Sequence, residues 1–294
     1  MVGFIGLGIM GKPMAKNLLK AGCQLMVYDV NLAVVEELAA LGARPSDPEG
    51  IGRDCEVVFT ILPTGAVVKQ VLFEEQGVAA SIKPGSIVCD MSSVTPQESQ
   101  YCSGKLKEKG VGFVDAPVSG GEPGAVNGTL AFMAGGERQN FDMLMPYFEI
   151  MGSSAILVGG SGSGSVAKLV NQIIVNLNIA VVSEAFVFAQ KAGVDPQKVY
   201  EAIRGGLAGS SVLDAKVPMM LDRNFNPGGK ISINHKDIKN VMATAHGLDV
   251  PVPFTCQLME IFQMLKVHGY MGEDHSGIVH YFEQLADVRV GQAE

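Results

Sequence analysis

The first half of the chain alternates short, unbroken apolar runs with segments of helical periodicity. Apolar runs without polar alternation are typical of parallel strands that are buried on both faces. Strands are expected at Val2–Ile5, Leu25–Tyr28, Ile87–Asp90, Gly112–Asp115 and at residues 57–62, 130–134 and 156–158. Helices are expected near residues 10–21, 31–41, 65–73 and 96–109. This alternation predicts an α/β fold with a doubly wound parallel sheet.

The second half of the chain is predicted to be all-helical. The change comes at residues 159–165, a segment made only of glycine and serine. Helices are expected at residues 166–191, after the Asp195-Pro196 cap, and near 212–221, 236–247, 252–267 and 275–288, with a loose tail at 287–294. We therefore expect two domains, an α/β domain at residues 1–161 and an all-α domain at 162–294. The second begins with a long interdomain helix.

Composition and charge exclude several classes of protein. Hydrophobic residues make up 47% of the 294 residues and charged residues 18%, as in a globular protein. The net charge of −8, without a basic cluster, argues against nucleic acid or an anionic membrane as a partner. A small anionic substrate stays compatible, because one or two lysines can hold a carboxylate. The most apolar stretch, residues 169–189, contains too many polar side chains for a helix that faces lipid.

Cysteine usage and the start of the chain both favour a cytoplasmic location. The five cysteines are odd in number and lack C-x-x-C spacing, which suits a reducing compartment. No basic leader or cleavage site accompanies the first apolar run, so no secretory signal is expected. The five histidines are not spaced with cysteines or carboxylates as metal ligands are, so we expect no metal.

A glycine-rich motif follows the first apolar run directly. Residues 6–11 match G-x-G-x-x-G between a strand and a helix, which is the context that makes the motif informative. In a Rossmann domain the three glycines permit the tight turn, the approach of a pyrophosphate, and close contact between helix and strand. The residues expected to contact the cofactor are Gly6, Leu7, Gly8, Ile9, Met10 and Gly11. An ordinary glycine-rich turn is the alternative.

Asp29 ends the second strand, where a carboxylate accepts hydrogen bonds from an adenosine ribose. Its charge would repel a 2′-phosphate, and residues 30–32 contain no arginine to hold one. The sequence therefore favours NAD, used as NADH, with NADP as the alternative. Asp29 could instead cap the helix that begins near Leu32.

Four motifs in a fixed order resemble the β-hydroxyacid dehydrogenase family over nearly the whole chain. They are the glycine motif, residues 115–121 (Asp-Ala-Pro-Val-Ser-Gly-Gly), residues 168–172 (Lys-Leu-Val-Asn-Gln) and residues 235–237 (His-Lys-Asp). The resemblance implies an NAD(P)-dependent oxidoreductase. Residues 120–123, 176–180 and 203–210 are most similar to members that act on tartronate semialdehyde.

The resemblance implies that Lys168 is the catalytic lysine. Reduction of an aldehyde requires a proton for the developing alkoxide, and an ammonium held on a rigid helix can stabilise that charge and donate the proton. Asn171 and Gln172 lie at i+3 and i+4, on the same helical face, so either amide could orient the lysine or the substrate. A structural hydrogen bond within a buried helix is the alternative for both amides.

The resemblance also implies the remaining site residues. Ser119, Gly120 and Gly121 offer a hydroxyl and unobstructed backbone N–H groups for a substrate carboxylate, although a plain glycine turn would have the same sequence. Lys236, with Asp237 as its partner, is expected near the nicotinamide and the substrate. Further cofactor contacts are expected at Leu62, Pro63 and Ser93, which follow strands at the carboxyl edge of the sheet.

The expected reaction is the reduction of a short 3-oxo acid by hydride transfer, with Lys168 as proton donor. Tartronate semialdehyde, giving D-glycerate, is the expected substrate, and methylmalonate semialdehyde (giving 3-hydroxyisobutyrate), succinate semialdehyde and glyoxylate are alternatives. A different class, a non-catalytic dinucleotide-binding module, stays open because fold and chemistry are separable. The long apolar helix also predicts a homodimer or homotetramer.

Overall fold

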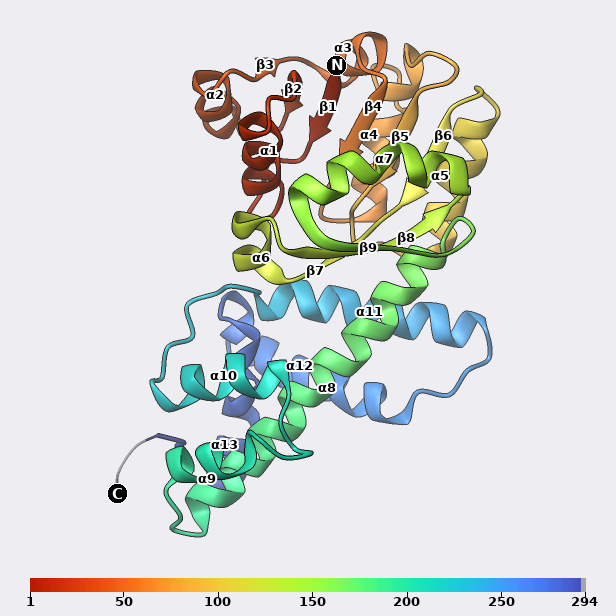
Figure 1. Ribbon diagram of the computed structural model, residues 1–294. Coiled ribbons are helices and arrows are strands. Elements are labelled where there is room, and N and C mark those ends of the chain that lie inside the picture. Colours follow the sequence, from red (N-terminus) through yellow and green to blue (C-terminus); the bar gives the residue numbers. More distant parts are fainter. Residues whose placement is uncertain (292–294) are drawn as a thin grey trace. The chain divides into compact units, whose positions relative to one another are not determined.

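The computed structural model describes residues 1–291, and these form two compact units that divide after Lys168. The first unit is an α/β domain and the second is all-helical (Figure 1). Helix α8 (Ser163–Lys191) begins in the first unit and continues into the second. The expected boundary at residue 161 precedes the first residue of this helix, whereas the two units divide within it. The expected fold class is confirmed.

One sheet forms the centre of the first unit. Its strands are β1 (Val2–Ile5), β2 (Leu25–Tyr28), β3 (Arg44–Pro45), β4 (Val57–Thr60), β5 (Ile87–Asp90), β6 (Gly112–Asp115), β7 (Val118–Ser119), β8 (Leu130–Gly136) and β9 (Gly152–Gly159). They are ordered β3-β2-β1-β4-β5-β6-β8-β7, and β9 pairs with β8. The first six strands in this order are parallel, and β8 is antiparallel to β6 and β7. The chain reverses its direction of winding between β1 and β4, and cofactors bind at the carboxyl ends of strands at such a point.

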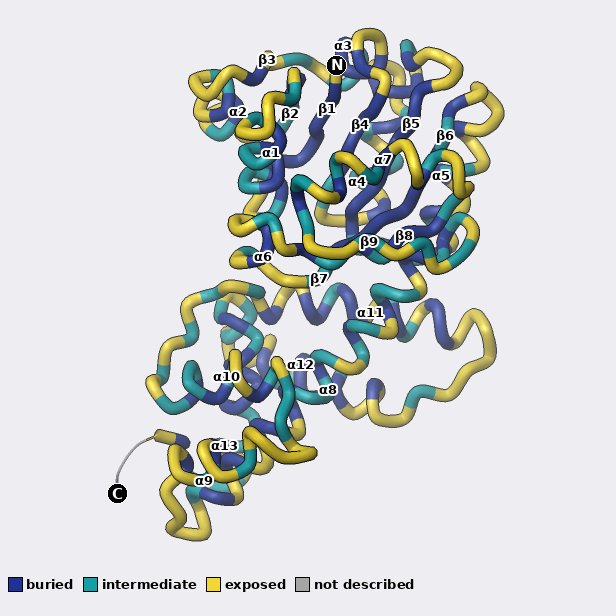
Figure 2. The backbone as a smooth tube through the Cα atoms, in the orientation of Figure 1, coloured by how far each residue is buried: buried dark blue, intermediate teal, exposed yellow. Residues whose placement is uncertain are grey.

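Two apolar cores cover the two faces of this sheet. Phe4 and Phe59 point into one core, and their neighbours Ile5 and Val58 point into the other. Every residue of β1, β4 and β5 is consequently buried, as Figure 2 shows by colour. Burial on both faces explains why these strands have unbroken apolar sequences.

The cores are closed by helices that connect the strands. These are α1 (Gly11–Lys20), α2 (Leu32–Ala40), α3 (Pro48–Asp54), α4 (Gly65–Phe73), α5 (Pro96–Lys107), α6 (Gly121–Asn127) and α7 (Arg138–Met151). Thr95 begins α5 with a capping box, in which its hydroxyl accepts the Glu98 N–H and the Glu98 carboxylate accepts the Thr95 N–H.

The second unit packs helices around a core that contains Phe186, Val217, Ile238, Leu258 and Phe262. Besides α8, the helices are α9 (Pro196–Ile203), α10 (Ser211–Leu221), α11 (Ile231–Gly247), α12 (Pro253–Val267) and α13 (Val279–Ala286). By length and composition alone, α8 could cross a membrane, but half of its most apolar window is buried inside the protein.

Three helices of the first unit, α3, α6 and α7, were not among the expected elements. In α7, Phe141, Leu144 and Phe148 are buried at helical spacing in the same core as Phe4. This burial outweighs the cost of Pro146 inside the helix, a residue that normally argues against helix.

Other boundaries also differ from the expected ranges. Helix α11 begins at Ile231 rather than near 236, and the helix expected at 275–288 is a 3₁₀ turn, His275–Ile278, followed by α13. The tail expected to be loose is held as far as Gly291, because Val290 is fully buried and its N–H donates to the Glu283 carboxylate at 2.8 Å. Residues 292–294 lie outside the described part of the chain.

Candidate active site

The glycine-rich turn lies at the carboxyl end of β1, where the chain reverses its winding. Gly6 has a φ of +96°, and a Cβ built on it would lie 2.2 Å from the carbonyl oxygen of Ile61. A Cβ on Gly11 would lie 1.9 Å from the carbonyl oxygen of Gly6. Both positions therefore require glycine, because the clashing atoms belong to the backbone.

The same turn has room and donors for a dinucleotide. Within the described chain, nothing lies within 4 Å of a Cβ built on Gly8, which is exposed. Met10, the N-cap residue of α1, has no side-chain oxygen with which to cap the first turn. Leu7 is buried, whereas Ile9 is 42% exposed. Helix N-termini bind phosphate through such uncapped N–H groups, so the turn fits the pyrophosphate of a nicotinamide dinucleotide.

Asp29 ties the end of β2 to this turn. One carboxylate oxygen accepts the Leu7 N–H at 2.5 Å, and the other accepts the Asn31 N–H at 2.8 Å. Asn31, not Asp29, is the N-cap residue of α2, so the helix-cap alternative for Asp29 does not describe the structure. A carboxylate has about four acceptor sites, and the half-buried Asp29 fits a ribose as a further partner.

A buried network shapes the loop after β4. Asp90, at the end of β5, accepts hydrogen bonds from the hydroxyls of Thr60 (2.8 Å) and Ser92 (2.5 Å). The Ser92 hydroxyl in turn accepts the Leu62 N–H at 2.8 Å. Burial raises the pKa of Asp90, against the effect of these hydrogen bonds.

The Asp90 network lies on the same sheet edge as the glycine turn. The Leu62 side chain lies 3.1 Å from a Cβ built on Gly6. Pro63 is exposed and Ser93 is half-buried. Asp90 and Thr60, which support this edge, were not among the expected site residues, although an acidic residue that ends an apolar strand was the available signal.

Lys168 lies near the start of α8, in the first unit. Its Nζ donates a hydrogen bond to the carbonyl oxygen of Val118 at 2.8 Å, and Ser119 is the next residue. The structure thus brings the expected catalytic lysine beside the segment expected to bind a carboxylate.

That segment forms a turn between β7 and α6. Ser119 ends β7 and is half-buried, and Gly120 and Gly121 are exposed. Their φ angles are +131° and +61°, conformations that favour glycine. Because Gly120 and Gly121 are exposed and have no side chains, the backbone beside Ser119 is suitable for a carboxylate ligand.

Asn171, Gln172 and Lys236 belong to the second unit. The Gln172 amide donates to Asp237 at 2.6 Å and to Asn234 at 3.2 Å, and Lys236 forms an ion pair with Asp237 at 2.8 Å. The Asn171 Oδ1 is enclosed, and no hydrogen-bond partner for it occurs among the described residues. The two amides thus differ, since Gln172 is engaged in a link between α8 and α11.

Metal-binding and disulfide chemistry find no support in residues 1–291. No group of histidine, cysteine and carboxylate side chains in this part of the chain could hold a metal ion. All five cysteines are free thiols.

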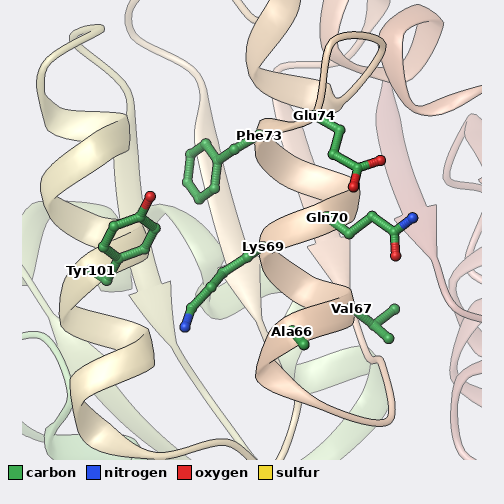
Figure 3. A pocket seen from close by; sticks show the side chains of 7 residues that line it. All are labelled: Ala66, Val67, Lys69, Gln70, Phe73, Glu74 and Tyr101. Carbon is green, nitrogen blue, oxygen red and sulfur yellow. The ribbon is translucent and has the colours of Figure 1, made fainter.

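A shallow surface pocket of about 510 Å³ lies between α4 and α5 (Figure 3). Lys69 lies in its wall, 3.5 Å from the Glu98 carboxylate and 5.5 Å from the centre of the Tyr101 ring. Phe73 packs edge-on against Tyr101. Because the charge of Lys69 is already balanced by Glu98, this pocket adds no residue to the site.

Two family models match the chain, one for each part. Residues 1–160 match the NAD binding domain of 6-phosphogluconate dehydrogenase. Residues 162–282 match the model described as NAD-binding of NADP-dependent 3-hydroxyisobutyrate dehydrogenase.

Similar proteins cover nearly the whole chain. The chain is 42% identical over 287 residues to 2-hydroxy-3-oxopropionate reductase of Escherichia coli, covering 97% of this chain and 98% of that protein. It is 34% identical to 2-(hydroxymethyl)glutarate dehydrogenase of Eubacterium barkeri, with coverage of 98% and 97%. A structure of Mycobacterium tuberculosis 3-hydroxyisobutyrate dehydrogenase with L-serine superposes with a TM-score of 0.88 at 28% identity, covering 95% and 97%.

The glycine turn predicts two different outcomes for alanine substitutions. Gly8→Ala should leave the free energy of unfolding within about 0.5 kcal/mol of wild type, because its Cβ meets open space. It should weaken NADH binding by about tenfold or more, because the methyl group fills the pyrophosphate approach. Gly11→Ala, the matched control, should lose about 1–3 kcal/mol of stability through its backbone clash. Urea denaturation and NADH fluorescence titration measure both, and wild-type affinity in Gly8→Ala would contradict the assignment.

Proposed function

The chain belongs to the β-hydroxyacid dehydrogenase family of NAD(P)-dependent oxidoreductases, and from that premise we propose that it reduces tartronate semialdehyde to D-glycerate. The observation that carries the proposal is the hydrogen bond of Lys168 Nζ to Val118, next to Ser119. It fixes a proton donor beside a segment suited to a carboxylate. The similarity to an enzyme named for this substrate supports the choice of aldehyde.

The proposed reaction transfers a hydride to the carbon and a proton to the oxygen of one carbonyl group. A bound reduced nicotinamide supplies the hydride to the aldehyde carbon. As that carbon–hydrogen bond forms, the carbonyl electron pair moves onto oxygen, and the ammonium of Lys168 stabilises the charge and donates its proton. In the reverse direction the neutral amine of Lys168 takes the hydroxyl proton.

Binding of the substrate carboxylate is assigned to residues 119–121. The Ser119 hydroxyl and the N–H groups of Gly120 and Gly121 are suitable donors for an anion. Of the two amides, we propose Asn171 as a substrate contact, since its oxygen is unused. Gln172 then holds Asp237, and through it Lys236, in place.

NADH is the proposed cofactor, with residues 6–11, Asp29, Leu62, Pro63 and Ser93 as its contacts. The hydrogen bonds of Asp29 to Leu7 and Asn31 support this choice, because they orient a carboxylate at the end of β2 where a ribose is expected. A cytoplasmic location is proposed from the reduced cysteines.

We also propose that the protein is a homodimer or homotetramer. On α8, Ile174, Val181 and Phe188 are 60%, 62% and 75% exposed and recur at seven-residue intervals, so they form one apolar stripe. Such stripes mark interfaces.

A panel of aldehydes tests the proposed function. Initial rates should be highest with tartronate semialdehyde and lower with methylmalonate semialdehyde, succinate semialdehyde and glyoxylate, because the 2-hydroxyl adds a hydrogen-bonding group that the site can recognise. A higher kcat/KM for another aldehyde would transfer the proposal to that substrate. Saturable NADH binding with no turnover of any of them would favour a non-catalytic module.

The same panel identifies the proton donor. Lys168→Ala should lower kcat by about 10²–10⁴-fold with little change in the Kd for NADH. Lys168→Arg should also be impaired, because a guanidinium stays protonated. Lys105→Ala, an exposed lysine on α5, is the matched control and should behave as wild type. A kcat near the wild-type value in Lys168→Ala rules out the assigned role.

The charge of Asp29 is predicted to set the preference between NADH and NADPH. The wild type should favour NADH over NADPH, because the carboxylate repels a 2′-phosphate. Asp29→Asn keeps an acceptor oxygen but removes the charge, so the ratio of kcat/KM for NADH to that for NADPH should fall about tenfold or more. A wild-type preference for NADPH would contradict the assignment of Asp29 as the residue that binds the ribose of NADH.

Light scattering tests the assembly. The expected mass is two or four times 31.0 kDa, and Phe188→Glu should lower it by placing a charge in the stripe. Leu207→Glu changes an exposed leucine that lies outside α8 and should leave the mass unchanged. A wild-type monomer would contradict the proposal.

A further inference from the structure

The start of α8 is capped by a carboxylate from a distant strand. Asp115, the last residue of β6, is 1% exposed, and its two oxygens accept the N–H groups of Gly162 (2.7 Å) and Ser165 (2.8 Å). A helix normally takes such a cap from the residue before its first turn. Here that residue is Gly162, which has no side chain, so Asp115 supplies the acceptors.

The close approach of strand and helix depends on small residues. A Cβ on Gly164 would lie 2.3 Å from the carbonyl oxygens of both Asp115 and Met133. A Cβ on Gly135 would lie 2.6 Å from the Gly164 nitrogen. Any side chain at these positions would move α8 away from Asp115.

A second contact lies one helical turn further along α8. Lys168 is three residues beyond Ser165, and its acceptor Val118 is three residues beyond Asp115. Residues 115–118 therefore hold α8 at two points. The first point is the backbone of the opening turn, and the second is the lysine Nζ. If the first is lost, the opening turn can fray or rotate, and the ammonium moves with it.

We propose that Asp115 is a positioning residue for Lys168, acting through the first turn of α8. The proposal rests on the proposed catalytic role of Lys168. Only the ionised carboxylate can accept both N–H groups through oxygens that carry no proton. An asparagine of the same shape offers one acceptor oxygen and turns its NH₂ group toward the other N–H.

The pH dependence that follows from ionisation of Asp115 distinguishes a role in positioning Lys168 from a role in stabilising the fold alone. Burial raises the pKa of Asp115 to about 6, while the N–H groups of Gly162 and Ser165 favour ionisation. The other titratable groups facing it belong to β5: Asp90, which also raises the pKa, and the Cys89 thiol. Because the pKa of Asp115 in the folded protein lies above the ordinary aspartate value of 3.8, the stability that this carboxyl contributes is greatest below about pH 4 and is lost as the pH rises through 6. Activity should change in the opposite direction, since the lysine is held best when Asp115 is ionised.

The experiment compares the wild type with Asp115→Asn between pH 5 and 8. The wild-type kcat should fall on the acid side with an apparent pKa near 6, and Asp115→Asn should lack this limb. Its kcat at pH 8 should be about 10–100-fold lower, with the Kd for NADH unchanged. Asp47→Asn, which alters the cap of α3, is the control and should keep the wild-type profile. Equal kcat and an unchanged acid limb in Asp115→Asn would overturn the proposal.

A second pair of variants covers the case in which Asp115→Asn does not fold. Ser165→Pro removes the N–H that Asp115 accepts, at a first-turn position whose N–H has no acceptor within the helix, and it also fixes φ there. Ser165→Ala controls for the hydroxyl, which bonds Ser99 at 2.9 Å. The kcat of Ser165→Pro should fall about tenfold or more below that of Ser165→Ala, and equal values would contradict the proposal.

A readout without substrate separates this inference from the proposed function. Lysines can be labelled by reductive ¹³C-methylation, and the Lys168 signal identified by its loss in Lys168→Arg. In Asp115→Asn this signal should move toward the shift of exposed lysines, and an unchanged shift would oppose the positioning role. If the wild type turns over none of the aldehydes, the proposed function fails, whereas the signal still tests the link between Asp115 and Lys168.

Discussion

Backbone N–H groups at the carboxyl edge of the sheet need acceptors, and three aspartates provide them. Where a buried strand passes into a loop or helix, the first backbone N–H groups no longer pair with a neighbouring strand. A buried N–H group without an acceptor destabilises the fold by about 1–3 kcal/mol. Asp29 follows β2 and holds the glycine turn, and Asp115 ends β6 and holds the start of α8. Asp90 ends β5 and reaches Leu62 through the Ser92 hydroxyl. Each carboxylate fixes a segment that begins or belongs to the candidate site.

This arrangement places negative charges near an edge that is expected to bind a pyrophosphate. Asp90 and Asp115 are both 1% exposed and direct their oxygens at donors of the protein itself. The glycine turn instead presents the uncapped N-terminus of α1, whose helix dipole favours an anion. The carboxyl edge of the sheet can therefore bind an anion despite its aspartates, because the oxygens of Asp90 and Asp115 point at donors within the protein.

Elements were predicted correctly from the sequence where a local residue pattern has a single physical explanation. Strands β1, β2, β5 and β6 were predicted with their exact ends, because burial on both faces leaves an unbroken apolar run. Helix α7 was missed because Pro146 opposes an apolar stripe that only packing against the sheet could favour. The different surroundings of Asn171 and Gln172 could not be predicted either, since they depend on Asn234 and Asp237, more than sixty positions away. Family motifs indicated the residues of the candidate site, but not the hydrogen bonds that these residues form.

The choice of aspartate at position 115 follows from these same constraints. A buried carboxylate is costly, and an apolar side chain of similar size is often neutral or stabilising in place of buried charge. At this position an apolar residue would leave the N–H groups of Gly162 and Ser165 without acceptors, and the Gly135–Gly164 contact leaves no space for a longer side chain. Asparagine satisfies one N–H group and sets a donor against the other. Aspartate is the small side chain that supplies two acceptors and no donor. The free-energy cost of burying its carboxylate is offset only when the first turn of α8 presents both N–H groups to it. Lys168 lies about one turn further along α8, so the buried carboxylate of Asp115 fixes the part of the helix from which the lysine extends.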